Sequence, residues 1–157
     1  MATYNKFQQF VEDLAKGGHG VGTHTLKRGL TNTSPNVADT DVDTTLSPDR
    51  IISTSNANEI AAGNGYTENG ESVTITTSSQ VAGTFTLAGN QVVWTGGPAA
   101  MATFRYPYLY NITGGAAATR PVIAWWDYGV GGVTLNVGET FTAKFNNANP
   151  GTIFTIV

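Results

Sequence analysis

The segment of residues 103–145 constrains the fold of this chain most strongly. Its sequence, TFRYPYLYNITGGAAATRPVIAWWDYGVGGVTLNVGETFTAKF, alternates aromatic and β-branched runs with glycine-rich turns and contains few ionisable side chains. Runs in which apolar residues recur at every second position predict short β-strands, and the Gly-Gly pairs at 96, 114 and 131 of the chain predict turns. The segment therefore indicates a packed β-surface with little side-chain chemistry for proton transfer.

Short strands are also predicted along the rest of the chain, separated by turn residues. Outside the aromatic segment, the predicted strands are residues 24–31, 51–53, 59–62, 72–77, 83–87, 91–95 and 152–157. Residues 88–91, Ala-Gly-Asn-Gln, are expected to form a hairpin turn between two of these strands, because Gly and Asn tolerate a positive φ. This spacing predicts an all-β fold, a β-sandwich or jelly-roll-like domain. The 157 residues are enough for one domain with its own core.

Residues 4–16 form the one predicted helix. Its apolar stripe at i, i+3, i+4 and i+7 consists of Phe7, Phe10, Val11 and Leu14. Thr3 or Asn5 is expected to cap its start, and Gly17 or Gly18 to end it. The predicted organisation is a helix and hinge at residues 1–18, then a sandwich domain at residues 19–157 with a long polar loop or arm at about residues 32–50. The helix docks either on its own sheet or on a neighbouring subunit.

Arg28 is an unexpected cation in the predicted strand 24–31. Strand alternation places its side chain on the same face as Leu26 and Leu30. We expect Arg28 either to lie at a sheet edge, where a charge discourages unwanted strand pairing, or to meet a carboxylate on a partner chain.

Charge and cysteine content exclude several classes of function. Charged residues make up 12% of the chain, its net charge is -3, and it contains no cysteine. Because the eight basic residues are spread along the chain without a cluster, we expect neither nucleic-acid binding nor attraction to an anionic membrane. The N-terminal sequence lacks the pattern of a secretory signal, so we expect the protein to be made in the cytosol.

An acidic cluster at residues 39–43 is the closest approach to a metal motif. Asp39, Asp41 and Asp43 are spaced like the start of a calcium loop, but Thr44 and Arg50 stand where that loop requires Gly and Glu. Solvated loop acids are the better interpretation, with a weak calcium site as the alternative.

Other candidate chemistry is also incomplete. His19 and His24 are too few for a zinc site without further ligands. The glycine-rich segments GGHGVG and GNGYTENG lack the helix that follows a phosphate-binding loop and its GK[ST] ending, so they are interpreted as turns. We therefore predict no cofactor and no metal, and we expect that the protein is not an enzyme.

The tyrosines and tryptophans allow three interpretations. Tyr106, Tyr108 and Tyr110 alternate and so share one face of a strand, with Leu109 opposite; Pro107 suggests an edge strand or a bulge. A second cluster contains Trp125, Trp126, Asp127 and Tyr128. Such aromatic residues form a buried core, a protein interface or a sugar-stacking surface.

Several segments together resemble a family of small structural proteins of tailed bacteriophages. They are MATYNKFQQFVEDLAKG, TLKRGLTNTSP, EIAAGNGYTENG, FRYPYLYN, WWDYG and VTLNVGETFT, and they span nearly the whole chain. Arg28, where an aliphatic residue is expected, and the glycine-rich GGHGVG turn depart from the pattern. Members of the family are virion, decoration or minor head proteins.

The resemblance implies a capsid decoration, or cement, protein. Such a protein would bind the outer surface of the shell formed by the major capsid protein, stabilise the mature head, and associate as a homo-dimer or homo-trimer. A phage tail or fibre protein, or a glycan-binding adhesin with a Trp/Tyr surface, is the alternative. The candidate interface residues are Phe7, Phe10, Leu14, Arg28, Tyr106, Tyr108, Trp125 and Trp126.

Overall fold

A computed structural model describes residues 2–35, 59–113 and 120–157. Four sequence predictions fall outside these residues: most of the arm at 32–50, the strand at 51–53, the Asp39, Asp41 and Asp43 cluster, and the turn at 114.

One layer of the fold is a five-stranded antiparallel sheet. Its edge strands are β1 and β3, and β7 lies at its centre. In spatial order the strands are β1 (Thr3–Lys6), β8 (Val122–Asp127), β7 (Tyr106–Asn111), β2 (Leu26–Thr31) and β3 (Glu71–Val73). The predicted edge position of Pro107 is therefore wrong, because β7 pairs with a strand on each side. The β7–β8 register begins at Tyr108, so the missing N–H of Pro107 falls outside that pairing.

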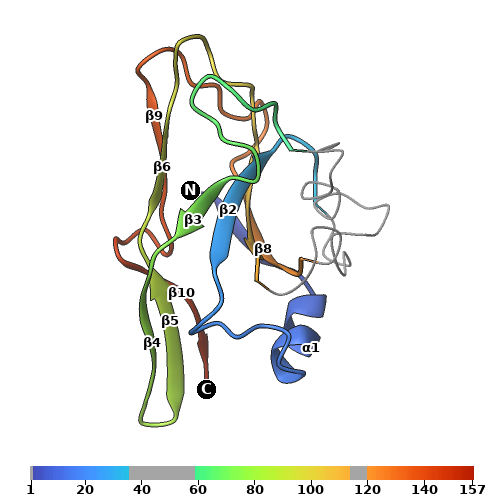
Figure 1. The fold of residues 1–157 in the computed structure, drawn as a ribbon, viewed down its shortest axis with the longest axis vertical. Helices are drawn as coiled ribbons and strands as arrows, with labels where there is room; N and C mark the ends of the chain where they lie inside the picture. The colour runs from blue at the N-terminus through green and yellow to red at the C-terminus, as the bar shows by residue number, and fades with distance from the viewer. Residues whose placement is uncertain (1, 36–58, 114–119) are drawn as a thin grey trace.

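Two smaller sheets form the opposing layer. One contains β10 (Gly151–Ile156), β5 (Thr84–Gly89) and β4 (Ile75–Val81), and the other pairs β6 (Val92–Thr95) with β9 (Thr140–Ala143). Figure 1 shows β6 and β9 above β4, β5 and β10, with the larger sheet on the other side of the molecule. The buried apolar side chains of the two layers form one core cluster. The predicted all-β, sandwich-like fold is thus confirmed.

The N-terminus contains both a strand and a helix, so the predicted helix at residues 4–16 is only partly right. Residues of β1 pair with β8, as Tyr4 does with Trp126, and the helix α1 covers Gln9–Ala15 only. Pairing with β8 satisfies the backbone of this segment and places the Tyr4 ring against the Trp126 ring, which local periodicity does not reveal. Gln8 occupies the N-cap position without a side-chain capping hydrogen bond, so the prediction of Thr3 or Asn5 as the cap is wrong.

Helix α1 docks on its own sandwich. Phe10 is buried and its ring lies 5.2 Å from that of Phe154 on β10, while Phe7 packs 4.5 Å from Trp125 on β8. The helix ends as predicted at Gly17, whose φ of 78° is the left-handed conformation that glycine adopts without a Cβ clash. At the lower end of the molecule in Figure 1, α1 lies beside the end of β10.

The predicted hairpin at residues 88–91 is wrong. Strand β5 pairs with β4 and β10, whereas β6 pairs with β9, so the chain passes from one small sheet to the other between β5 and β6. The tight hairpin instead joins β4 to β5, where Ala82 and Gly83 have φ values of 48° and 87°. Two consecutive residues with positive φ form the turn whose twist matches that of paired strands. The predicted strand at residues 59–62 is reduced to one bridge between Thr31 and Glu59.

Candidate functional site

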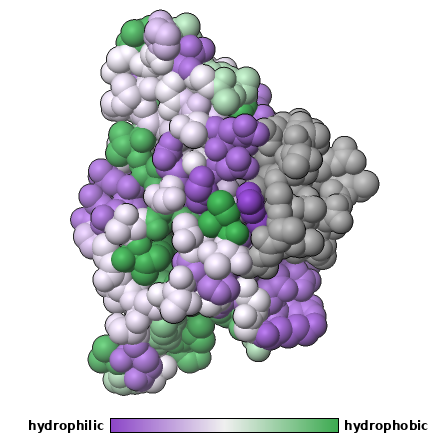
Figure 2. All heavy atoms as spheres, in the orientation of Figure 1, coloured by the Kyte–Doolittle hydropathy of each residue, from purple (hydrophilic) through white to green (hydrophobic). Residues whose placement is uncertain are grey.

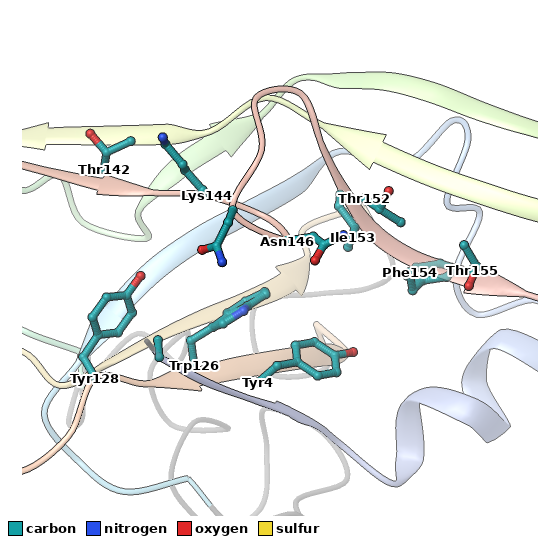
Figure 3. Close-up of a pocket in the computed structure, with 12 residues that line it drawn as sticks. Tyr4, Trp126, Tyr128, Thr142, Lys144, Asn146, Thr152, Ile153, Phe154 and Thr155 are labelled. Carbon is teal, nitrogen blue, oxygen red and sulfur yellow. The ribbon is translucent and has the colours of Figure 1, made fainter.

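An open cleft lies between the two layers of the sandwich and has a volume of about 600 Å³. One wall comes from β1 and the end of β8, and the other from β9, β10 and the segment between them (Figure 3). It is lined by Ala2, Tyr4, Trp126, Tyr128, Thr142, Lys144, Asn146, Asn147, Thr152, Ile153, Phe154 and Thr155. Each of the flanking strands β1, β9 and β10 is the outermost strand of its sheet, which explains why the layers are open here.

Three aromatic rings form one wall of the cleft. Tyr4 and Trp126 are register partners on β1 and β8, and their ring centroids lie 5.6 Å apart in an edge-to-face arrangement. Tyr128, two residues beyond Trp126, projects on the same side in Figure 3. Trp126 is mostly buried, Tyr128 is half-buried, and Tyr4 is 45% exposed. A ligand in the cleft would therefore meet the Tyr4 ring most directly.

The opposite wall carries uncharged polar groups. Asn146 and Asn147 have φ values of 46° and 55° and form a tight turn that the Ala148 N–H closes by donating to the Phe145 carbonyl at 3.0 Å. In Figure 3 the Asn146 amide projects from this turn towards the aromatic wall. Hydroxyl groups of Thr142, Thr152 and Thr155 also line the cleft. Among the lining residues Lys144 is the one that carries a charge.

Arg28 lies behind the aromatic wall, fully buried. Its guanidinium carbon is 4.0 Å from the centroid of Trp126 and 4.7 Å from that of Phe145. Nη1 donates to the Lys144 carbonyl at 3.5 Å, a long contact, while Nε and Nη2 have no hydrogen-bond partner. Burial lowers the pKa of Arg28 from its usual range to about 9, and nearby Tyr128 opposes this effect.

Both sequence interpretations of Arg28 are wrong. Strand β2 lies between β3 and β7, so Arg28 is not at a sheet edge. The Arg28 side chain has no solvent-exposed surface, so a carboxylate of a partner chain has no access to it. The rings of Trp126 and Phe145, which contact each other edge to face, take the place of the expected counter-ion.

Most of the predicted interface residues lie in the core of the chain. Seven are less than 9% exposed, namely Phe7, Phe10, Arg28, Tyr106, Tyr108, Trp125 and Trp126. Leu14 is only partly buried and packs at the margin of the core. For the aromatic clusters, burial confirms the core interpretation, which was one of the three that we considered. Trp126 alone among the eight lines the cleft.

The tyrosine face behaves as alternation predicts. The rings of Tyr108 and Tyr110 stack with centroids 5.7 Å apart, and the Tyr110 hydroxyl donates to the Asn69 carbonyl at 2.7 Å. Tyr108 lies over Gly29 of β2, where an added Cβ would come within 2.2 Å of the tyrosine oxygen. Burial raises the pKa of Tyr108 well above its usual value of 10. These groups hold the sheet together and are not accessible to a ligand.

Two buried polar networks lie apart from the cleft. Tyr66 donates its hydroxyl proton to Glu59 and accepts the Leu30 N–H at 3.1 Å. Burial raises the pKa of Glu59. The amide nitrogen of Asn111 lies 3.2 Å from Nδ1 of His19 and 2.9 Å from Nδ1 of His24. Both networks connect distant segments.

The two histidines thus come together, as part of a hydrogen-bond network around Asn111. The described residues hold no group of three or more His, Cys, Asp or Glu side chains placed to bind a metal ion. Within the same residues, no helix has the length and apolar character needed to cross a bilayer.

The sequence interpretation named Tyr128 in the second aromatic cluster but missed the cleft residues Tyr4 and Asn146. Two signals were present: the alternation of Trp126 and Tyr128, and the Asn-Asn pair, which is typical of a tight turn. Neither signal reveals that residues near the N-terminus face a turn near the C-terminus. No protein-family model matches the chain, and neither a curated protein nor a solved structure is similar enough to match it.

Proposed function

We propose that this chain is a bacteriophage capsid decoration protein, which binds the outer surface of the major capsid protein shell and stabilises the mature head. The observation that carries the proposal is the resemblance to phage structural proteins in segments spread over nearly the whole chain. The fold is compatible with this role. A sandwich with a single hydrophobic core is already folded before it binds, so it can attach to the shell as a rigid body.

The composition of the surface supports attachment through neutral contacts. Most of the face in Figure 2 is white or pale purple, with separate green patches of hydrophobic residues. Only 12% of the chain is charged. Binding through hydroxyl, amide and small apolar groups should depend weakly on salt, because few charges are available to be screened. A steep loss of capsid binding between low and moderate salt would contradict this mode of attachment.

The helix offers a surface for the proposed homo-dimer or homo-trimer. Val11 is 51% exposed on α1, and Leu14 is partly buried beside it. Deleting residues 1–18 would not test this contact, because the deletion also removes β1 and the buried Phe7 and Phe10. Val11→Ser is the sharper variant: it should weaken self-association, measured by sedimentation, without lowering the melting temperature. Val130→Ser, at another exposed valine, is its matched control.

Symmetry-resolved cryo-electron microscopy of intact particles tests the proposal directly. Sandwich-shaped density at repeated positions on the outside of the shell, with a copy number close to that of the capsid protein, is the expected result. A bare shell with matching density only on the tail would overturn it and favour the tail or fibre alternative. Gel densitometry of the same particles gives an independent copy number.

A further inference from the structure

We propose that the cleft between β1, β8, β9 and β10 is a carbohydrate-binding site that takes a short oligosaccharide. The inference depends on the cleft alone, so it holds or fails independently of where in a virion the protein resides. A volume of about 600 Å³ falls in the range of pockets that enclose small molecules. The chemistry of its two walls selects the class of ligand.

The aromatic wall suits the apolar face of a sugar ring. Sugars present C–H groups on one face of the ring, and an aromatic side chain provides an apolar surface for them together with a polar edge. Tyr4 is 45% exposed and is oriented by its edge-to-face contact with Trp126. Trp126 is in turn held from behind by Arg28, 4.0 Å from its centroid. The stacking surface is therefore built on paired strands and does not depend on a loop.

The opposite wall suits the hydroxyl groups of a sugar. An amide both donates and accepts hydrogen bonds, and so does a threonine hydroxyl, which matches the mixed character of sugar hydroxyls. Asn146 is held in a two-residue turn with positive φ, and Figure 3 shows its amide facing the aromatic wall across the cleft. Thr152 and Thr155 add hydroxyl groups from β10.

The charge of the cleft further restricts the class of ligand that it can bind. Lys144 is its one charged lining residue, and no carboxylate lines it. A neutral sugar or one with a carboxylate group is therefore admitted, whereas an amine finds no counter-ion. Hydrolysis of a glycosidic bond requires a pair of carboxyl groups on either side of that bond. The lining residues of this cleft provide none, so the site is one for binding and not for cleavage.

The experiment uses the purified full-length chain on an array of neutral and acidic oligosaccharides, followed by calorimetry with each saccharide that is retained. Saturable binding is expected, with a ring-stacking contribution from Tyr4. Tyr4→Ala should weaken binding at least tenfold, and Tyr4→Phe, which keeps the ring, should bind nearly as well as the unaltered chain. Asn146→Gly keeps the positive φ of the turn while removing the amide, and should also weaken binding about tenfold.

Asn64→Gly is the matched control, because Asn64 also has a positive φ, of 51°, but does not line the cleft. Its affinity should equal that of the unaltered chain, and all variants should keep their far-ultraviolet circular dichroism and a cooperative thermal transition. The proposal is overturned if no saccharide on the array binds, or if binding is indifferent to both Tyr4→Ala and Asn146→Gly. Binding of an extended peptide that saccharides do not displace would likewise overturn it, since the strand edges beside the cleft would then be the site.

Discussion

The Arg28 guanidinium stacks on the Trp126 ring at 4.0 Å and has no carboxylate partner in the described chain. A second ring, that of Phe145, covers it at 4.7 Å. A desolvated cation over an aromatic face gains about 2 kcal/mol. Two unpaired donors, Nε and Nη2, offset that gain, because each buried group without a hydrogen bond costs about 1–3 kcal/mol.

Replacing this cation with an apolar side chain of similar length should therefore cost little. Arg28→Met is expected to leave the free energy of unfolding unchanged or to raise it by up to about 2 kcal/mol, measured by urea denaturation. Arg105→Met is the comparison. Arg105 forms a two-pronged ion pair with Asp127 at 2.7 Å, so its loss should lower the free energy of unfolding, but only slightly because the pair is solvent-screened. A loss of more than about 2 kcal/mol in Arg28→Met would show that ring stacking outweighs the unpaired donors.

Gly29 should be irreplaceable for a packing reason. A Cβ at this position would lie 2.2 Å from the Tyr108 hydroxyl oxygen and 2.3 Å from its Cζ, so the ring would have to move out of a closely packed sheet. Gly29→Ala is expected to lower the free energy of unfolding by about 3 kcal/mol or more. In the Tyr108→Leu background, which lacks the obstructing ring atoms, the same substitution should cost clearly less. Equal costs in the two backgrounds would contradict the clash.

Ala82 offers a stabilising substitution. It adopts a φ of 48° in the turn between β4 and β5, a conformation that costs an alanine about 1–2 kcal/mol and is well tolerated by asparagine. Ala82→Asn would create an Asn-Gly turn with Gly83 and should raise the free energy of unfolding by about 0.5–1 kcal/mol in thermal or urea melts. Ala99→Asn, at an exposed position outside a positive-φ turn, should have no such benefit.

His19 should make stability sensitive to acid. Burial lowers its pKa from 6.5 to about 4, while Asp13 opposes this shift and His24 adds to it. Between these two pH values the unfolded chain binds a proton at His19 and the folded chain does not. The free energy of unfolding should therefore fall as the pH decreases from 6.5 to 4, by about 1–3 kcal/mol from this group.

The slope of stability against pH isolates this effect. His19→Gln should flatten the decline between pH 6.5 and 4, whatever its effect at neutral pH. Glu59 has the opposite effect on the pH dependence of stability. Burial raises its pKa, so its protonation at low pH stabilises the folded chain. That contribution is present in both proteins and cancels in the comparison. An unchanged slope in the variant would show that His19 titrates as it does in the unfolded chain.

Local pattern was sufficient for the class of fold and for several elements. Alternation of apolar residues predicted the strands at 91–95 and 152–157 within a residue or two of β6 and β10. It also predicted the shared face of Tyr108 and Tyr110, because the period of two follows from the geometry of any strand. The end of the helix at Gly17 followed from backbone chemistry alone.

Strand pairing decided what local pattern left open. Residues 4–6 have a pattern that suits a helix, yet they form β1, because β8 provides a pairing partner and Trp126 an aromatic contact for Tyr4. Asn90 comes directly after β5 and is a residue typical of hairpin turns. The chain nevertheless passes there from one small sheet to the other.

Composition and the spacing of near neighbours were enough to predict an all-β protein whose aromatic residues suit a core. The tertiary fold places the buried Arg28 against the rings of Trp126 and Phe145, and it brings Tyr4 and Asn146 to the same cleft. Those relationships join segments at opposite ends of the chain. They arise from the order of strands in each sheet and from the packing of two layers, which no local pattern of residues encodes.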